Sequence, residues 1–329
     1  MVVSSLINYK MSGCEKMSGC DKKAIFLVMS SRVIVGGVKR DRSPTGAQPY
    51  NVAATRQLLG YVNGMAPQNF SMETIIHLID VRRADPNVKD ISNRTAIMKI
   101  CMLCTRMVGG EFHDKLLGAF KFLLGREDIC VNEADRLGDW PIHHAAFMAD
   151  SKFLKVLLEH RSAREGINAL NDRAGLAPLH IACSNDFVPV KIIEYLLRAG
   201  ANPNIQCGRF GKTPLHYVLQ TYGGYAQYGD KLVLILQAFF QNPDTVLGNP
   251  GFRDNLGKTL LHYAVEHVRS RAVIDMLLEW GENQSLGVSD NMNYTPIRSA
   301  VQRGHAEAVA AFRNYATRKF RRGEFRLAG

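Results

Sequence analysis

Thr213-Pro214-Leu215-His216-Tyr217-Val218 is the stretch that decides the fold, because close copies of it recur along the chain. The three other clear copies are Pro141-Ile142-His143-His144-Ala145-Ala146, Ala177-Pro178-Leu179-His180-Ile181-Ala182 and Thr259-Leu260-Leu261-His262-Tyr263-Ala264. Two degenerate copies flank these four, namely Thr95-Ala96-Ile97-Met98 and Thr295-Pro296-Ile297-Arg298-Ser299-Ala300. Repetition at a period of about 33 residues or slightly more predicts a helical solenoid, in which each repeat packs only against its neighbours.

These copies resemble the T-P-L-H-x-A signature of the ankyrin-repeat family. The resemblance implies an all-α ankyrin-repeat solenoid of about six to seven helix-turn-helix repeats with finger loops. It also implies a class of function, because a solenoid is an extended surface that holds another macromolecule and offers no obvious place for chemistry.

Each motif position has a separate predicted role. The Thr hydroxyl is expected to cap the first helix by accepting a backbone N–H bond. Pro suits the first helical turn, so helices are predicted to begin at Pro141, Pro178, Pro214 and Pro296. The family resemblance implies that the motif His bonds to the backbone of a neighbouring turn, which makes four histidines structural: His143, His180, His216 and His262.

The two ends of the array depart from the motif. Arg298 takes the place of the His in the last copy, which suits a terminal repeat with a polar outer face. Met98 takes that place in the first copy, and an apolar side chain there loses the hydrogen bond between turns.

The spacing of the copies is uneven. Pro141 to Pro178 covers 37 positions and Pro178 to Pro214 covers 36, whereas Ala96 to Pro141 covers 45 and Pro214 to Leu260 covers 46. We expect the extra residues of the two long intervals to lie in loops, because a longer repeat helix would lose its stacking. Such insertions often lie on the binding face.

The positive charge is concentrated at the ends. Of the net charge of +11, residues 1–43 and 313–329 carry +5 each, and residues 44–312 carry +1. We therefore expect a basic, disordered segment at 1–49, the repeat domain at 50–312 and a basic tail at 313–329. The nearly neutral body argues against nucleic acid as the partner. The tail Arg318-Lys319-Phe320-Arg321-Arg322 is either a contact for anionic lipid or the nuclear import machinery, or a solvated cap on the last helix.

Seven cysteines without a framework spacing indicate reduced thiols and an intracellular protein, expected in the cytoplasm and the nucleus. Cys101-Met102-Leu103-Cys104 is either half of a metal or redox site or a pair of small core residues. The second interpretation is favoured, because no further ligand pair lies at a suitable spacing, so no metal and no cofactor are expected. No apolar stretch approaches the roughly 20 residues needed to cross a bilayer.

Three groups of residues are candidates for contact with a partner. The insertion Thr221–Asp230 carries Tyr222, Tyr225 and Tyr228 among flexible residues, which is typical either of a binding loop or of a tolerant surface loop. Trp140 replaces the motif Thr and is either an exposed anchor or packed against a neighbouring finger. The family resemblance adds residues of the finger loops and inner helices: Arg209, Phe210, Lys212, Tyr217, Asn255, Tyr263, Asn293 and Tyr294.

The chain lacks the phosphate-loop and zinc-protease motifs, and its repeated histidines are better explained as structural. The sequence thus favours a monomeric scaffold or adaptor that binds an unidentified protein partner without catalysis. Three alternatives stay open. They are a host-directed effector of a pathogen or symbiont that uses the same repeats, binding of nucleic acid or anionic lipid by the basic termini, and an enzyme within residues 1–50.

Overall fold

The computed structural model describes residues 50–64, 69–104, 109–148, 150–245, 252–280 and 285–322. All of them belong to one compact unit of the chain, residues 41–329. Every regular element in these ranges is a helix, which confirms the predicted all-α class. The segment 1–49, predicted to be disordered, lies outside the described residues.

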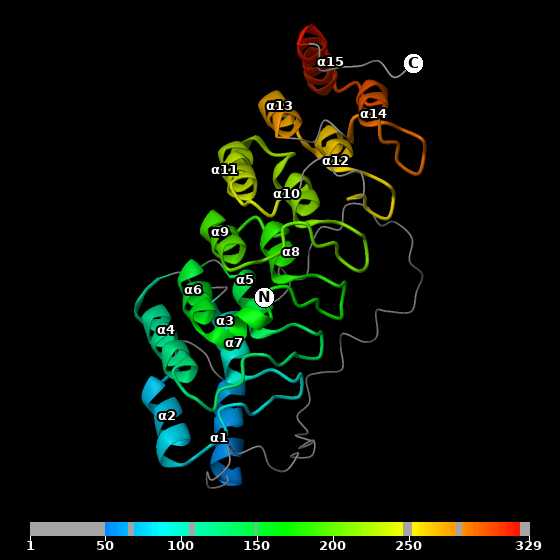
Figure 1. The fold of residues 1–329 in the computed structure, drawn as a ribbon. Helices are drawn as coiled ribbons and strands as arrows, with labels where there is room; N and C mark the ends of the chain where they lie inside the picture. Colours follow the sequence, from blue (N-terminus) through cyan, green and yellow to red (C-terminus); the bar gives the residue numbers. More distant parts are fainter. Residues whose placement is uncertain are drawn as a thin grey trace, which may run out of the picture. The chain divides into compact units, whose positions relative to one another are not determined.

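The described helices form seven consecutive pairs, each with an inner and an outer member (Figure 1). The inner helices are α1 (Val52–Asn63), α3 (Ala96–Cys104), α5 (Pro141–Ala146), α8 (Pro178–Cys183), α10 (Pro214–Tyr222), α12 (Leu260–His267) and α14 (Pro296–Gln302). The outer helices are α2 (Met72–Ile76) with its continuation η1 (His77–Val81), α4 (Glu111–Leu124), α6 (Ser151–Glu159) followed by α7 (Arg161–Glu165), α9 (Val190–Arg198), α11 (Gly229–Phe240) preceded by η2 (Ala226–Tyr228), α13 (Arg271–Glu279) and α15 (Ala306–Arg321). The predicted six to seven repeats are confirmed.

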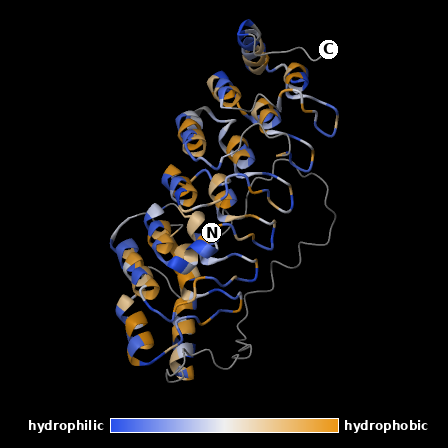
Figure 2. Cartoon of the chain, viewed as in Figure 1, coloured by the Kyte–Doolittle hydropathy of each residue, from blue (hydrophilic) through white to orange (hydrophobic). Residues whose placement is uncertain are grey.

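The pairs stack in chain order and share one core. Each inner helix contacts the next inner helix from α1 to α14, and the outer helices pack on one another in the same way at α2–α4, α4–α6, α6–α9, α9–α11 and α13–α15. Helix α9 shows why: it buries Ile192, Ile193, Leu196 and Leu197 along one stripe. Figure 2 shows the hydrophobic residues gathered on the helices, while the loops that project to one side are mostly hydrophilic. These loops are the predicted finger loops.

The motif prolines lie where the sequence predicts them. Helices α5, α8, α10 and α14 begin at Pro141, Pro178, Pro214 and Pro296, where the missing N–H is no loss. His180 and His216 are completely buried. Exposure of these two side chains would have been incompatible with the repeat packing.

The prediction that repeat helices do not lengthen is wrong. In the two long intervals α4 has 14 residues and α11 has 12, compared with nine in α6 and α9. Helices α3 and α10 have nine residues each, compared with six in α5 and α8. A helix can extend beyond its neighbours because only the turns that face the next pair must stack.

The end of the array also differs from the predicted division. Helix α15 runs to Arg321, so the expected boundary at residue 312 falls inside a helix. Arg318 of its last turn lies 2.9 Å from the carboxylate of Glu279 on α13. The basic cluster therefore begins as part of the last helix, where cations are favoured by the helix dipole. Among the described residues no helix is both long and apolar enough to span a membrane.

Candidate functional site

The finger loops are joined into a ladder by backbone hydrogen bonds. Within one finger, the Cys207 N–H donates to the Lys212 carbonyl at 2.9 Å. Between fingers, the Asn255 N–H donates to the Phe210 carbonyl at 2.9 Å. Equivalent bonds join the other neighbouring fingers, with Arg136 donating to Ser92, Asp172 to Leu137, Gly208 to Gly175 and Asn291 to Leu256. Hydrogen-bonded strands lie about 4.8 Å apart. One such spacing within a finger and one between neighbouring fingers place successive fingertips roughly 10 Å apart.

The motif histidines tie each first helix to the next finger. The His180 Nδ1 accepts the Ala177 N–H at 3.1 Å, and its Nε2 donates to the Lys212 carbonyl at 3.0 Å. His262 repeats this with Thr259 and the Tyr294 carbonyl. Burial lowers the pKa of His180 to about 4, so the ring is neutral and uses both nitrogens. The predicted bonding of the motif His to the backbone of a neighbouring turn is present at His143, His180 and His262. At His216 the Nε2 has no hydrogen-bond partner in the described parts of the chain.

The predicted role of the motif Thr is wrong at two positions. The hydroxyl of Thr213 lies 2.8 Å from the His216 Nδ1, and neither it nor the Thr259 hydroxyl accepts a backbone N–H of its helix. At both positions the Thr hydroxyl contacts the buried imidazole of the motif His instead. Thr295 does cap α14 as expected, because Arg298 replaces the His there and leaves the hydroxyl free for the Arg298 N–H at 3.3 Å.

Met98 shows the cost of losing the motif His. Its side chain is completely buried, and the hydroxyl of Thr95 has no hydrogen-bond partner in the described parts of the chain. In the complete repeats the imidazole supplies that partner. This finding agrees with the lost bond that the sequence indicated.

The tyrosine insertion is not the open loop that its composition indicated. Helix α10 continues through Tyr222, whose side chain is fully buried and donates a hydrogen bond to the Asn185 carbonyl at 2.7 Å. Tyr222 therefore cannot contact a partner, and its selection as a binding residue is wrong. The hydroxyl of Tyr228 donates to the carboxylate of Asp186 at 2.8 Å. Of the three tyrosines only Tyr225 is largely exposed, and the other two bond to residues 185 and 186, so the segment is folded onto the preceding repeat.

Trp140 is half-buried and packs inside its own repeat. A Cβ added to Gly166, at the end of α7, would lie 2.6 Å from the Trp140 ring. The backbone N–H of Trp140 donates to the His143 Nδ1 at 3.0 Å, as in the other repeats. Trp140 is thus packed and is not a fully exposed anchor, but the packing contact shown is with the end of α7 and not with a neighbouring finger as the sequence suggested.

Two predicted tyrosines of the inner helices differ in exposure. Tyr263 is almost fully buried, its ring lies edge-on to His216, and its hydroxyl donates to the Asp254 carboxylate at 2.8 Å. Burial raises the pKa of Tyr263 well above its usual value. Tyr263 supports the site from within, and the prediction that its side chain contacts a partner is wrong. Tyr217 is half-buried, with its ring edge-on to His180.

The structure brings three predicted aromatic residues together around the ammonium group of Lys212, which is itself a predicted residue. Its Nζ lies 5.6 Å from the centre of the Phe210 ring, 5.5 Å from that of Tyr217 and 5.1 Å from that of Tyr263. It donates one hydrogen bond, to the amide oxygen of Gln220 at 2.9 Å. Burial lowers the pKa of Lys212. Arg209 is exposed, with its guanidinium 5.2 Å from the Phe210 ring.

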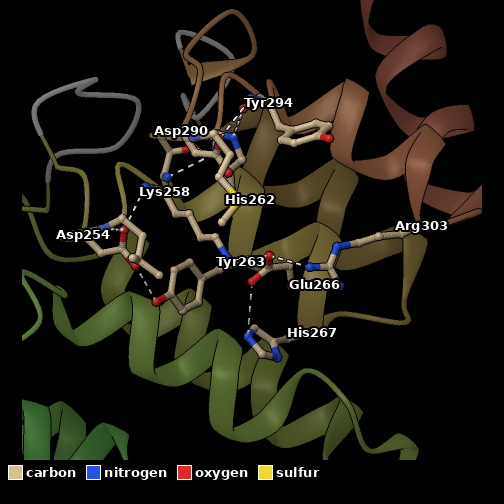
Figure 3. A network of polar contacts seen from close by, with 12 residues as sticks. Asp254, Lys258, His262, Tyr263, Glu266, His267, Asp290, Tyr294 and Arg303 are labelled. Carbon is tan, nitrogen blue, oxygen red and sulfur yellow. Dashed lines mark hydrogen bonds and ion pairs between the residues drawn. The ribbon is translucent and has the colours of Figure 1, made fainter. Parts of the chain in front are cut away.

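A charged network on the next inner helix was not predicted (Figure 3). The Glu266 carboxylate lies 2.6 Å from Lys258 and 2.8 Å from Arg303. His267 lies beside the same carboxylate, and burial lowers the His267 pKa. The sequence held a signal for the ion pair of this network. The run from Lys258 to Glu266 aligns with the run from Lys212 to Gln220 at a distance of 46 residues, and Glu266 takes the place of Gln220.

The remaining predicted residues lie in the finger loops. Asn255 is exposed, and its side-chain amide donates to the Arg209 carbonyl at 2.9 Å, so it supports the neighbouring finger. Asn293 is exposed and holds a left-handed turn with φ of 60°. Tyr294 is half-buried, and the Arg298 guanidinium lies 4.9 Å from its ring.

Apolar side chains recur at one position of the fingertips, which sequence reasoning missed except at Phe210. Leu137, Phe210, Leu256 and Met292 each precede the turn residue of their finger and are 46%, 39%, 58% and 76% exposed. We call these four residues the fingertip row. The backbone ladder holds them in a fixed register.

One group of possible metal ligands occurs in the described ranges, formed by Asp135, Asp139 and His144. One Asp135 oxygen lies 3.3 Å from the His144 Nε2, and the other accepts two backbone N–H bonds of its finger. Asp254 and Tyr263 make the same arrangement in a later repeat. The group is therefore the local form of a contact that shapes each finger. Cys101 and Cys104 are buried on α3 as free thiols, and burial raises the pKa of Cys104 to about 12.

Comparisons with known proteins agree with this geometry. The chain is 32% identical over 90 residues to the nuclear factor NF-kappa-B p105 subunit of Gallus gallus, a match that covers 27% of this chain and only 9% of that protein. It resembles the crystal structure of the ankyrin repeat domain of Bcl-3, described as a unique member of the IkappaB protein family. The TM-score is 0.55 with 17% identity, over 78% of this chain and 97% of that one. This likeness shows a shared fold.

A weaker likeness, with a TM-score of 0.46 and 19% identity, covers 69% of this chain and 99% of a chain in another structure. That structure contains the Bd0816 predatory endopeptidase of Bdellovibrio bacteriovorus in complex with immunity protein Bd3460.

A family model described as ankyrin repeats in three copies matches residues 111–207 and again residues 189–286. Together the two matches cover more than half of the 329 residues. With seven stacked helix pairs, a ladder of finger loops and histidine ties between repeats, the chain belongs to the ankyrin-repeat family of protein-interaction modules.

Proposed function

We propose that this chain is a scaffold or adaptor that binds one partner protein across its fingertips and the exposed parts of its inner helices, without catalysis. The observation that carries the proposal is the fingertip row. Four large apolar side chains at equivalent positions stay in water on loops that are otherwise mostly polar. Exposed apolar groups gathered on one surface are typical of protein interfaces.

The rigidity of the fingers supports the same proposal. Because each fingertip is hydrogen-bonded to its neighbour, a partner does not have to order these loops on binding. Ordering interface side chains and loops costs free energy, so a preformed row favours affinity. The four motif histidines do not suit catalysis, since all four are buried and three of them, His143, His180 and His262, bond to the backbone of the next finger.

We also propose that binding takes place inside the cell, in the cytoplasm or the nucleus. The five cysteines in the described ranges are all free thiols, as expected for a reducing compartment.

The test is a matched pair of charge insertions at equally exposed leucines. Leu256 of the fingertip row is 58% exposed, and Leu234 on the outer helix α11 is 52% exposed. We expect Leu256→Asp to weaken capture of the partner from lysate at least about tenfold, because a carboxylate would have to be desolvated in the interface. Leu234→Asp should leave capture unchanged.

Quantitative mass spectrometry of proteins bound to the wild type and the two variants makes the comparison. Loss of the same proteins with Leu234→Asp alone would move the binding surface to the outer helices. Equal capture by all three proteins would contradict the proposal.

A further inference from the structure

Two repeats carry runs of ten residues that are identical at six positions, and the two runs differ in the group that contacts their lysine. Gly211–Gln220 begins with Gly-Lys-Thr and ends in Gln, whereas Gly257–Glu266 begins identically and ends in Glu. Lys258 and Glu266 form an ion pair at 2.6 Å with side chains only 20% and 14% exposed. The second run therefore shows how this arrangement looks when its cation is paired.

Lys212 occupies the equivalent place without a carboxylate. Gln220 offers it a neutral amide oxygen at 2.9 Å, and within the described ranges no carboxylate lies at ion-pair distance from Lys212. The nearby acids are engaged elsewhere, since Asp254 accepts the Tyr263 hydroxyl and Glu266 serves Lys258 and Arg303. The Lys212 ammonium is thus a half-buried cation with an incomplete set of partners.

The surroundings of Lys212 add further cations and exposed apolar side chains. Arg209 lies over the exposed Phe210 ring and, among the described residues, has no ion pair. The exposed Arg173 of the preceding finger is likewise without an ion pair in the described part of the chain. Leu256 and Met292 continue the apolar row on the next two fingers. Cations beside aromatic and aliphatic groups suit a segment that carries both a carboxylate and large apolar side chains.

We propose that Lys212, Arg209 and Phe210 form a receptor for an acidic side chain of the partner polypeptide, whose neighbouring apolar side chain packs along Phe210 and Leu256. The partner carboxylate supplies Lys212 with the negative charge that Glu266 supplies to Lys258. This inference rests on the proposed function and adds the chemistry of the partner. A nucleic acid fits less well, because its phosphates would leave the aliphatic Leu256 and Met292 without contacts.

The decisive variant is Gln220→Glu, which builds into the protein the ion pair that the next repeat already has. Gln220 is exposed near the end of α10, so the change should not disturb the fold. The control is Gln220→Ala, which removes the amide oxygen without supplying a charge. Thermal unfolding of both variants verifies that they are folded.

The probe is a displayed library of random short peptides, selected on the wild type and both variants and read by sequencing. We expect the wild type and Gln220→Ala to enrich peptides with Asp or Glu beside a large apolar residue. Gln220→Glu should bind the selected peptides about tenfold more weakly. The difference should shrink as salt is raised, because exposed charges are screened.

Several outcomes would overturn the inference. These are enrichment of peptides without acidic residues, equal binding by wild type and Gln220→Glu, or no enriched peptides at all. A fluorescent single-stranded DNA serves as a second probe. If the wild type binds this DNA, Gln220→Glu does not bind it and no acidic peptide is enriched, Lys212 is a site for phosphate instead. In each case the separate Leu256→Asp comparison still decides whether the fingertips bind a protein.

Discussion

At His180 a single imidazole joins two repeats through both of its ring nitrogens. The Nδ1 must be unprotonated to accept the Ala177 N–H, and the Nε2 must carry the proton that it donates to the Lys212 carbonyl. A proton on Nδ1 would remove the first bond and bury a charge. The stability of the array is therefore linked to the neutral form of its motif histidines.

This linkage predicts acid sensitivity in a defined range. Burial lowers the pKa of His180 and of His216 to about 4, below the ordinary value of 6.5, and lowers the pKa of His143 and His262 in the same direction. The unfolded chain then binds more protons than the folded one between pH 6.5 and about 4. The free energy of unfolding should be fully retained above pH 6.5 and should fall toward pH 4, by about 3 kcal/mol each for His180 and His216.

Urea unfolding at a series of pH values measures this loss. A His180→Gln variant is less stable, yet its free energy of unfolding should depend less steeply on pH. About one proton fewer should be taken up on unfolding in this range, because the imidazole is absent. Carboxylates with lowered pKa values, such as Asp90 and Asp135, act at lower pH and do not mimic the effect. A flat profile between pH 6.5 and 4 would contradict the assigned protonation state.

At the scale of the element, the finger loops behave as a strand-like ladder made of turns. Their close contact depends on glycines in the left-handed region, where a side chain is strained. At Gly175 φ is +64°, its carbonyl accepts the Gly208 N–H, and an added Cβ would lie 2.5 Å from the Gly208 nitrogen. Gly304, between α14 and α15, has nearly the same φ of +65° with nothing within 4 Å of an added Cβ.

The two glycines give a matched pair of substitutions. Gly304→Ala should lower the free energy of unfolding by about 1 kcal/mol, which is the cost of left-handed backbone alone. Gly175→Ala should lower it by about 3 kcal/mol, because the added methyl group also pushes neighbouring fingers apart. Chemical denaturation measures both values. Equal losses would mean that the contact between the fingers at Gly175 contributes little.

At the scale of the whole molecule, stability should be local along the stack. Each helix pair contacts mainly the pairs beside it, as expected of a solenoid. The last pair covers α12 and α13, supplies the carbonyl that His262 uses, and carries Arg303 and Arg318, which pair with Glu266 and Glu279.

Removal of everything after residue 287 should therefore destabilise one end of the array. The backbone amides of α12 and α13 should lose protection from hydrogen exchange, whereas those of α3 to α6 should keep it. Hydrogen exchange followed by mass spectrometry measures both ends in one sample. An equal loss of protection at α3 to α6 would show that the array unfolds as a single cooperative unit.

How much was predictable from sequence follows from the range of each interaction. The helix starts at the motif prolines and the burial of the motif histidines were predicted, because each depends on residues within one repeat and its direct neighbour. The exposure of the tyrosines was not. Tyr222 is buried by Asn185, 37 positions earlier, and Tyr263 bonds an aspartate at the base of its own finger.

The sequence by itself determined the repeat architecture, since a motif copied at a regular period imposes the same local caps, turns and apolar stripe each time. Only the tertiary structure decided which side chains are exposed along the fingertips. The fingertip row exists because backbone bonds between loops align Leu137, Phe210, Leu256 and Met292. Stacking also decides that Lys212 meets an amide and aromatic rings and, among the described residues, no carboxylate; the motif does not specify those groups.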